Sequence, residues 1–216
     1  HKDNHHILAV NNEYTNRDII HGNRASKKPE NDDDIRKNML AHGVSIIEIK
    51  EKLGKWSLVK DSIYNRRLFP NSPVQAVGPA SGHKLLQTSA DPKGRNLLGT
   101  WNNCGSCKTP WGTFLTCEEN FNGYFSSTDK NFSISSEMEK YGIGRRDWGY
   151  NWFKIDERFD ISKHPNEPNR CGYVVEIDPL LPNSVPKKLT ALGRFKHENA
   201  EISISKVFKE ERSIFR

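Results

Sequence analysis

Three of the four cysteines and two adjacent glutamates lie in one short stretch, Gly99 to Phe125, and these are the side chains best suited to chemistry. Cys104 and Cys107 form a Cys-x-x-Cys pair, and Glu118 and Glu119 follow the third cysteine directly. A thiolate is a soft ligand and carboxylate oxygens are hard ligands, so their combination suits a transition metal or a mixed set of cations. The stretch therefore predicts a metal site built from cysteine and glutamate.

Other roles are open to the same residues. A Cys-x-x-Cys pair can be redox-active, form a disulfide in an oxidising compartment, or supply half of a zinc site. Cys117 and Cys171 would complete a four-cysteine set, but Cys171 has no second Cys-x-x-Cys around it, and this spacing is poor for structural zinc. Spacing alone favours a structural or disulfide role over zinc. The two glutamates would point to opposite sides if the strand continues, but both could face one cation if the chain bends there. The alternative for them is a solvated acidic pair.

Local signals place these residues at turns and at the end of a strand. Asn102–Gly105 predicts a tight turn, because Asn and Gly tolerate positive φ, and Thr109–Gly112 predicts a second turn. Thr113–Glu118 predicts a short strand with both glutamates at its end. The expectation is a thiol in a loop close to two carboxylates.

Two further glutamates are weaker candidates. Glu198 follows a histidine, and Glu13 follows an apolar run and two asparagines. The sequence contains no serine-hydrolase elbow, phosphate-binding loop, dinucleotide fingerprint or zincin motif. The residues alone therefore indicate a metal site and no particular reaction.

Short strands separated by Gly and Pro predict a mainly-β fold of the propeller, sandwich or barrel type. One helix is predicted at Asp32–His42, with Ile35, Met39 and Leu40 on one face. Loops are predicted at residues 16–31, 66–82 and 126–168. The remaining strands are predicted at His6–Glu13, Val44–Lys50, Lys55–Lys60, Cys171–Asp178 and Glu201–Phe208. The strands at 44–50 and 55–60 are expected to pair as a hairpin.

Composition sets further limits. Hydrophobic residues make up 34% of the 216-residue chain, and the mean hydropathy is -0.79. No apolar run approaches the roughly 20 residues of a transmembrane helix. The formal net charge is +6, but the basic residues are dispersed and no nucleic-acid-binding motif is present, so no nucleic-acid partner is expected.

Several segments together resemble the signature of the PhoX-type alkaline phosphatases. The central match is specific, and the others follow in the family's order along almost the whole chain. The matching segments are Asn12–Thr15, Asn102–Gly105, Thr109–Thr113, Cys117–Phe121, Gly172–Pro179 and Leu192–Glu198.

The resemblance implies an exported phosphomonoesterase with a β-propeller fold and a centre of ferric iron and calcium. It implies that Cys104 is the iron-binding thiolate and that Glu198 is an iron ligand. It also implies that Glu13, Glu118 and Glu119 are ligands of iron or calcium.

Members of that family are longer than this chain and commonly carry a small residue where Cys107 stands, so a Cys104–Cys107 disulfide could compete with iron. Residues 1–216 are therefore expected to form a single, incomplete propeller portion that is truncated at its C-terminus, with one short helix. The expected protein is periplasmic or secreted, monomeric, and acts on phosphate monoesters. The alternative is a non-catalytic propeller fragment or calcium-binding scaffold that lacks the C-terminal half of the site.

Overall fold

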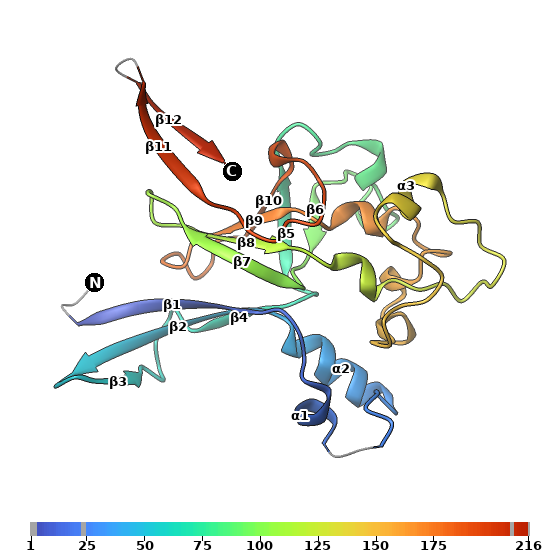
Figure 1. Cartoon of the computed structure of the whole chain (residues 1–216), viewed down its shortest axis with the longest axis horizontal. Coiled ribbons are helices and arrows are strands. Elements are labelled where there is room, and N and C mark those ends of the chain that lie inside the picture. Colours follow the sequence, from blue (N-terminus) through green and yellow to red (C-terminus); the bar gives the residue numbers. More distant parts are fainter. Residues whose placement is uncertain (1–3, 23–24, 208–209, 216) are drawn as a thin grey trace.

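The computed structural model describes residues 4–22, 25–207 and 210–215, with side chains described up to residue 204. Its strands form sheets of four, six and two strands. Figure 1 shows the two larger sheets beside each other, with the two-stranded hairpin extending away from them. The mainly-β prediction is confirmed, and the described residues show no closed barrel or propeller.

The four-stranded sheet is built around one long strand. Its members are β1 (His5–Asn12), β2 (Gly43–Lys52), β3 (Lys55–Leu58) and β4 (Arg66–Leu68). β1 pairs with one edge of β2, and β3 and β4 share the other edge, all antiparallel. Leu53 and Gly54 have φ of 54° and 76°, which suits the tight hairpin between β2 and β3. The predicted hairpin is confirmed, whereas β4 lies in a segment predicted to be a loop.

The six-stranded sheet carries the cysteine-rich stretch. Its members are β5 (Pro73–Val77), β6 (Asn96–Leu98), β7 (Asn103–Lys108), β8 (Phe114–Glu118), β9 (Val174–Ile177) and β10 (Lys187–Leu189). The strand order is β6-β5-β10-β9-β8-β7, antiparallel except for β10 with β5. The strands predicted at 113–118 and 171–178 are confirmed.

The third sheet is the hairpin of β11 (Ile202–Val207) and β12 (Glu210–Phe215). The strand predicted at Glu201–Phe208 is therefore confirmed as far as Val207. Phe208 lies outside the described residues.

The predicted helix is α2 (Asp32–Ala41), and its start is capped by Asn31, which accepts a hydrogen bond from the Asp34 amide. Ile35 and Met39 are buried, but Leu40 is 47% exposed, so the three residues predicted on one face do not share the buried side of the helix. The prediction of one helix was also wrong. The described residues include α1 (Arg17–His21), α3 (Ser136–Lys140) and six short 3-10 helices, at Lys84–Leu86, Phe121–Tyr124, Trp152–Lys154, Glu157–Phe159, Glu167–Arg170 and Thr190–Leu192. These elements are too short to show a helical period in the sequence.

Five of the twelve buried members of the largest cluster come from the region predicted to be a long loop. Trp152, Phe159 and Ile161 pack there with Trp101 and Tyr124, and each is at most 2% exposed. The region does have little regular structure, as predicted. It is nevertheless a packed part of the core, because aromatic side chains fill space without needing a regular backbone.

His42 follows α2 and lies inside this aromatic cluster. Its side chain is fully buried, and Nδ1 donates to the Asn38 carbonyl oxygen at 2.8 Å. Tyr124, Tyr150 and Trp152 meet the ring edge-on. Burial lowers the pKa of His42 from 6.5 to about 4, so the imidazole is neutral in the folded protein at pH 7.

We expect His42 to make the fold sensitive to mild acid. Between pH 6.5 and 4 the unfolded imidazole takes up a proton that the folded one does not, so the free energy of unfolding falls, by about 3 kcal/mol in all. Urea unfolding of the wild-type protein and of His42→Phe over this pH range measures the difference. An equal loss of stability in both proteins would contradict this role for His42.

Candidate metal centre

Three sheet strands bring three ligands to one point. Glu13 follows the end of β1, Cys104 is the second residue of β7, and Glu119 follows the end of β8. One ligand atom from each lies within 4.8 Å of the others, and all three side chains are partly buried. Ligand bonds of about 2.0–2.5 Å to one cation would produce separations in this range.

The position of Cys104 depends on a bulge and on an asparagine of another sheet. The pairing of β7 with β8 shifts between Asn103 and Ser106, which breaks the regular alternation of side chains. Asn11 in β1 donates through Nδ2 to the Cys104 carbonyl oxygen. The predicted turn was therefore wrong at Cys104, which lies in a strand, although Asn102 just before it does have a positive φ of 51°.

The position of Glu119 depends on Asn102. The Glu119 amide donates to the Asn102 carbonyl oxygen at 3.0 Å, and the Asn120 amide donates to Asn102 Oδ1. Asn120 in turn donates through Nδ2 to the Tyr14 hydroxyl at 3.0 Å, which ties the residue after Glu119 to the residue after Glu13. Sequence reasoning missed these supporting asparagines, and the Asn-Asn pairs at 11–12 and 102–103 were the available signal.

The ionised forms of these three side chains would repel one another when no cation is between them. Burial and the charge of Glu119 raise the pKa of Glu13. Burial, followed by the charges of Glu13 and Glu119, raises the pKa of the Cys104 thiol to about 11. A bound cation would offset this repulsion and favour the thiolate. The donor set therefore fits a cation that accepts sulfur and oxygen ligands.

Glu118 has different partners from its neighbour. It is fully buried, and Lys188 Nζ lies 2.9 Å from Oε1. The Thr100 hydroxyl donates to Oε1 at 2.8 Å, and the amides of Gly172 and Tyr173 donate to Oε2 at 3.0 and 3.3 Å. Both oxygens are thus occupied inside the protein. The two adjacent carboxylates do not face one cation, because neighbouring side chains leave a strand on opposite sides.

Glu198 lies near the group without belonging to it. Its side chain is exposed, and its charge contributes to the raised pKa of Cys104. The Gly105 amide donates to the Glu198 carbonyl oxygen at 2.6 Å, which holds this segment against β7. Among the residues that the structure describes, the group within 4.8 Å consists of Glu13, Cys104 and Glu119.

Gly105 permits this approach because it has no side chain. A Cβ at this position would lie 2.5 Å from Asn199 Oδ1 and 2.6 Å from the Glu198 carbonyl oxygen. We expect Gly105→Ala to push residues 198–199 away and to lower the free energy of unfolding by about 1–3 kcal/mol. Gly144→Ala is the matched control, because no atom lies within 4 Å of its added Cβ. Urea unfolding compares the two variants, and equal stabilities would show that the contact at Gly105 is not tight.

All four cysteines are free thiols in this structure, so the disulfide between Cys104 and Cys107 is not formed. Cys117 is buried beside Leu115 and Val174, whereas Cys171 is buried in the aromatic cluster. Among the described residues no four-cysteine group is assembled and no disulfide is formed. The structure therefore supports neither the four-cysteine zinc site nor the disulfide.

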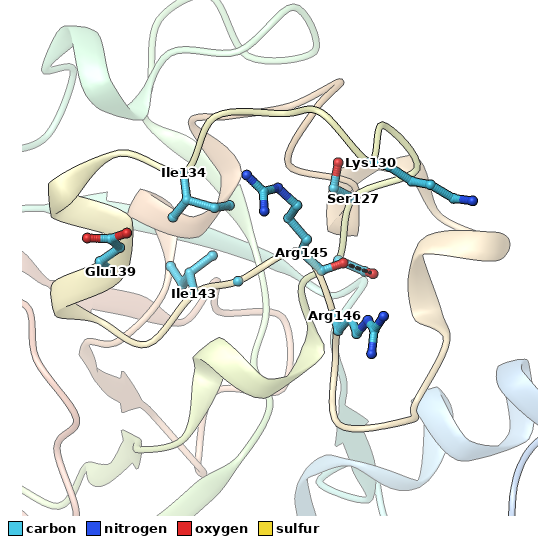
Figure 2. A pocket seen from close by; sticks show the side chains of 9 residues that line it. Ser127, Lys130, Ile134, Glu139, Ile143, Arg145 and Arg146 are labelled. Atoms are coloured by element: carbon cyan, nitrogen blue, oxygen red, sulfur yellow. Dashed lines mark hydrogen bonds between the residues drawn. The ribbon is translucent and has the colours of Figure 1, made fainter.

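A large surface cavity does not mark the candidate centre. A cavity of about 860 Å³ is lined by residues from 126 to 146, and none of the three grouped ligands lines it. Figure 2 shows that the charged ends of its basic residues Lys130, Arg145 and Arg146 point in different directions. They do not converge on one anion.

The fold and the grouped side chains define a mainly-β protein with a candidate cation site made of one thiol and two carboxylates. The sequence profile of the family Alkaline phosphatase PhoX matches residues 1–211. The chain belongs to the PhoX alkaline phosphatase family.

A solved structure agrees with this assignment. The chain is similar to Pseudomonas fluorescens PhoX, determined in complex with vanadate, a transition-state analogue, with 47% sequence identity and a TM-score of 0.89. The match covers 95% of this chain and 35% of that protein, so the chain spans about a third of the relative's length. Among curated protein sequences none matches this chain. Among the described residues, no helix has the length and apolar character needed to cross a membrane.

Proposed function

We propose that this chain supplies part of the metal centre of an alkaline phosphatase that hydrolyses phosphate monoesters. The observation that carries the proposal is the convergence of Glu13, Cys104 and Glu119 in a chain of the PhoX family. Vanadate bound to the similar Pseudomonas protein supports phosphoryl chemistry for that relative.

For the metals we propose ferric iron and calcium. Cys104 is assigned to iron, because iron is bound by cysteine thiolates whereas calcium takes oxygen ligands, and the carboxylates of Glu13 and Glu119 suit either cation. Glu198, which lies near Cys104, is proposed as a further iron ligand. Glu118 is not proposed as a ligand, because both of its oxygens already have partners. Bound cations would supply positive charge that stabilises a phosphoryl group in transfer.

The chain's own contribution is to hold the ligands in place before a cation arrives. Asn11 fixes the backbone of Cys104, and Asn102 fixes the turn that carries Glu119. Ligands held on strand ends by such contacts lose little freedom on binding, which raises affinity.

The alternative is a scaffold that binds calcium and has no turnover. It is favoured by one observation, namely that two of the three grouped side chains are carboxylates, which calcium prefers. Elemental analysis for iron, calcium and zinc, with a phosphomonoester assay on the same sample, separates the two functions. Iron and calcium with phosphate release would support the phosphatase, whereas calcium alone without turnover would support the scaffold. Zinc without iron would contradict both.

We also propose the wider arrangement that the family resemblance implies. The two larger sheets would be parts of a β-propeller, in which blades of antiparallel strands surround a centre. The protein would be exported to the periplasm or medium and would act as a monomer. Cell fractionation and light scattering of the full-length protein test the location and the assembly.

A further inference from the structure

A buried ion pair lies directly behind the candidate metal centre. The side chains of Glu118 and Lys188 are both 0% exposed, and their charged atoms are 2.9 Å apart. Lys188 Nζ also donates to the Arg170 carbonyl oxygen at 2.8 Å and lies 5.4 Å from the centre of the Trp101 ring. A charge pair is costly to bury unless its remaining polar atoms are partnered. Because these atoms are partnered, the pair holds a defined geometry.

The pair fixes the end of the strand that carries a proposed ligand. Glu118 is the last residue of β8, and Glu119 follows it. Through Oε2, Glu118 accepts the amides of Gly172 and Tyr173, just before β9. The direction in which Glu119 leaves the sheet is therefore determined by Glu118 on the opposite side.

Hydrogen bonds continue from the pair into β7. The Thr100 hydroxyl donates to Glu118 Oε1 and accepts from Asn103 Nδ2 at 2.9 Å. The same Asn103 amide donates to the Thr116 hydroxyl of β8 at 3.1 Å. Asn103 immediately precedes Cys104, so the hydrogen bonds of the Asn103 side chain hold the residue before the thiol in place.

The bonds then reach the strand that carries Glu13. The Thr116 hydroxyl donates to Asn11 Oδ1 at 2.8 Å, and Asn11 Nδ2 donates to the Cys104 carbonyl oxygen. Glu13 lies two residues beyond Asn11. A connected set of buried and partly buried polar groups thus links the ion pair to all three strands that supply ligands.

We propose that Glu118 and Lys188 are positioning residues for the metal centre, acting through Thr100, Asn103, Thr116 and Asn11. This inference rests on the proposed metal site. Outer residues that orient ligands typically contribute about 10–100-fold to metal affinity. Thr116 is the point where the connection passes from the six-stranded sheet to β1, so its hydroxyl is the group to remove.

Cadmium binding tests the inference without any measurement of activity. Cadmium is a soft cation that gives an ultraviolet charge-transfer band with a thiolate, and the band can be titrated on the purified chain. We expect Thr116→Val to weaken cadmium binding by about tenfold or more, because it removes the hydroxyl at nearly constant volume. We expect Thr116→Ser, which retains the hydroxyl, to bind within about twofold of wild type. Equal affinities of the Val and Ser variants would overturn the inference.

A double variant at the ion pair keeps the test valid if Thr116→Val does not fold. Glu118→Gln/Lys188→Met removes both charges together, and we expect weaker cadmium binding by a similar factor. Asp156→Asn is the control, because it disrupts another largely buried ion pair, in which Asp156 lies 2.7 Å from Arg158 and which shares no residue with the chain of bonds described above. Wild-type affinity in the double variant would show that the Glu118–Lys188 pair supports the fold only, and this result would also overturn the inference.

Failure of the inference and failure of the proposed metal site give different results. If the wild-type chain shows no thiolate band with cadmium, or if Cys104→Ala shows the same band, the metal site itself is wrong. If the wild-type band depends on Cys104 while the Thr116 and Glu118–Lys188 variants bind as tightly as wild type, only the positioning role is wrong.

Discussion

Replacing Cys104 with alanine is expected to weaken the binding of ferric iron and cadmium at least about 100-fold. That figure is the upper end of the loss seen for residues that only orient a ligand, and Cys104 is proposed as a ligand itself. The thiol is the soft donor of the group, so its loss leaves only carboxylates, which suit calcium and magnesium better. Metal content after dialysis and the cadmium charge-transfer band measure the effect, and phosphate release by the full-length protein should fall in parallel.

Cys107→Ala is the matched control for this experiment. Cys107 lies on the same strand, but it packs beside the cluster formed by Leu115, Cys117 and Val174, not in the group of three ligands. We expect its metal content to equal that of wild type. Retention of iron and of the cadmium band by Cys104→Ala would exclude the proposed role of this thiol.

Replacing Lys188 with methionine is expected to be the most destabilising single change that the structure predicts. It removes the positive partner of Glu118 and leaves a carboxylate fully buried. Breaking a buried pair in this way lowers the free energy of unfolding by about 3–5 kcal/mol. Urea unfolding at pH 7 measures this loss.

Two comparisons show whether the loss comes from the unpaired charge. Glu118→Gln/Lys188→Met leaves no charge buried, so we expect it to regain much of the stability that the single variant loses. Lys187→Met changes the neighbouring lysine, which is exposed, and should stay within about 0.5 kcal/mol of wild type. A double variant no more stable than Lys188→Met would mean that the packing of Lys188, and not its charge, carries the effect.

Local patterns in the sequence were sufficient to predict several secondary-structure elements of this protein. The helix α2, the hairpin of β2 and β3, and the strands β8 and β9 follow from caps, turn residues and apolar runs within about ten residues. The metal-site prediction also followed from composition, since a thiol and several carboxylates in one stretch indicate a cation. Family membership could be predicted because the matching segments occur in order along the chain.

The tertiary structure decided which of these residues meet. Glu118 and Glu119 are equivalent in the sequence, yet one is paired with Lys188 inside the protein and the other lies with Glu13 and Cys104. The sequence could not separate them, because the strand direction at that point depends on Lys188 and Gly172, which are far along the chain. The bulge at Cys104 was hidden for a similar reason, since the Asn11 side chain that binds the Cys104 carbonyl oxygen lies 93 residues earlier.

The aromatic core shows the same limit on a larger scale. Residues 126–168 have no clear period, so the sequence predicted a loop, but their aromatic side chains pack against Trp101 and Tyr124. The sequence by itself determined the local elements and the kinds of ligand, because both depend on near neighbours. Only the tertiary structure decided which candidate ligands lie together and which residues form the core. Contacts between distant segments determine which side of a strand faces the candidate centre and which faces the interior.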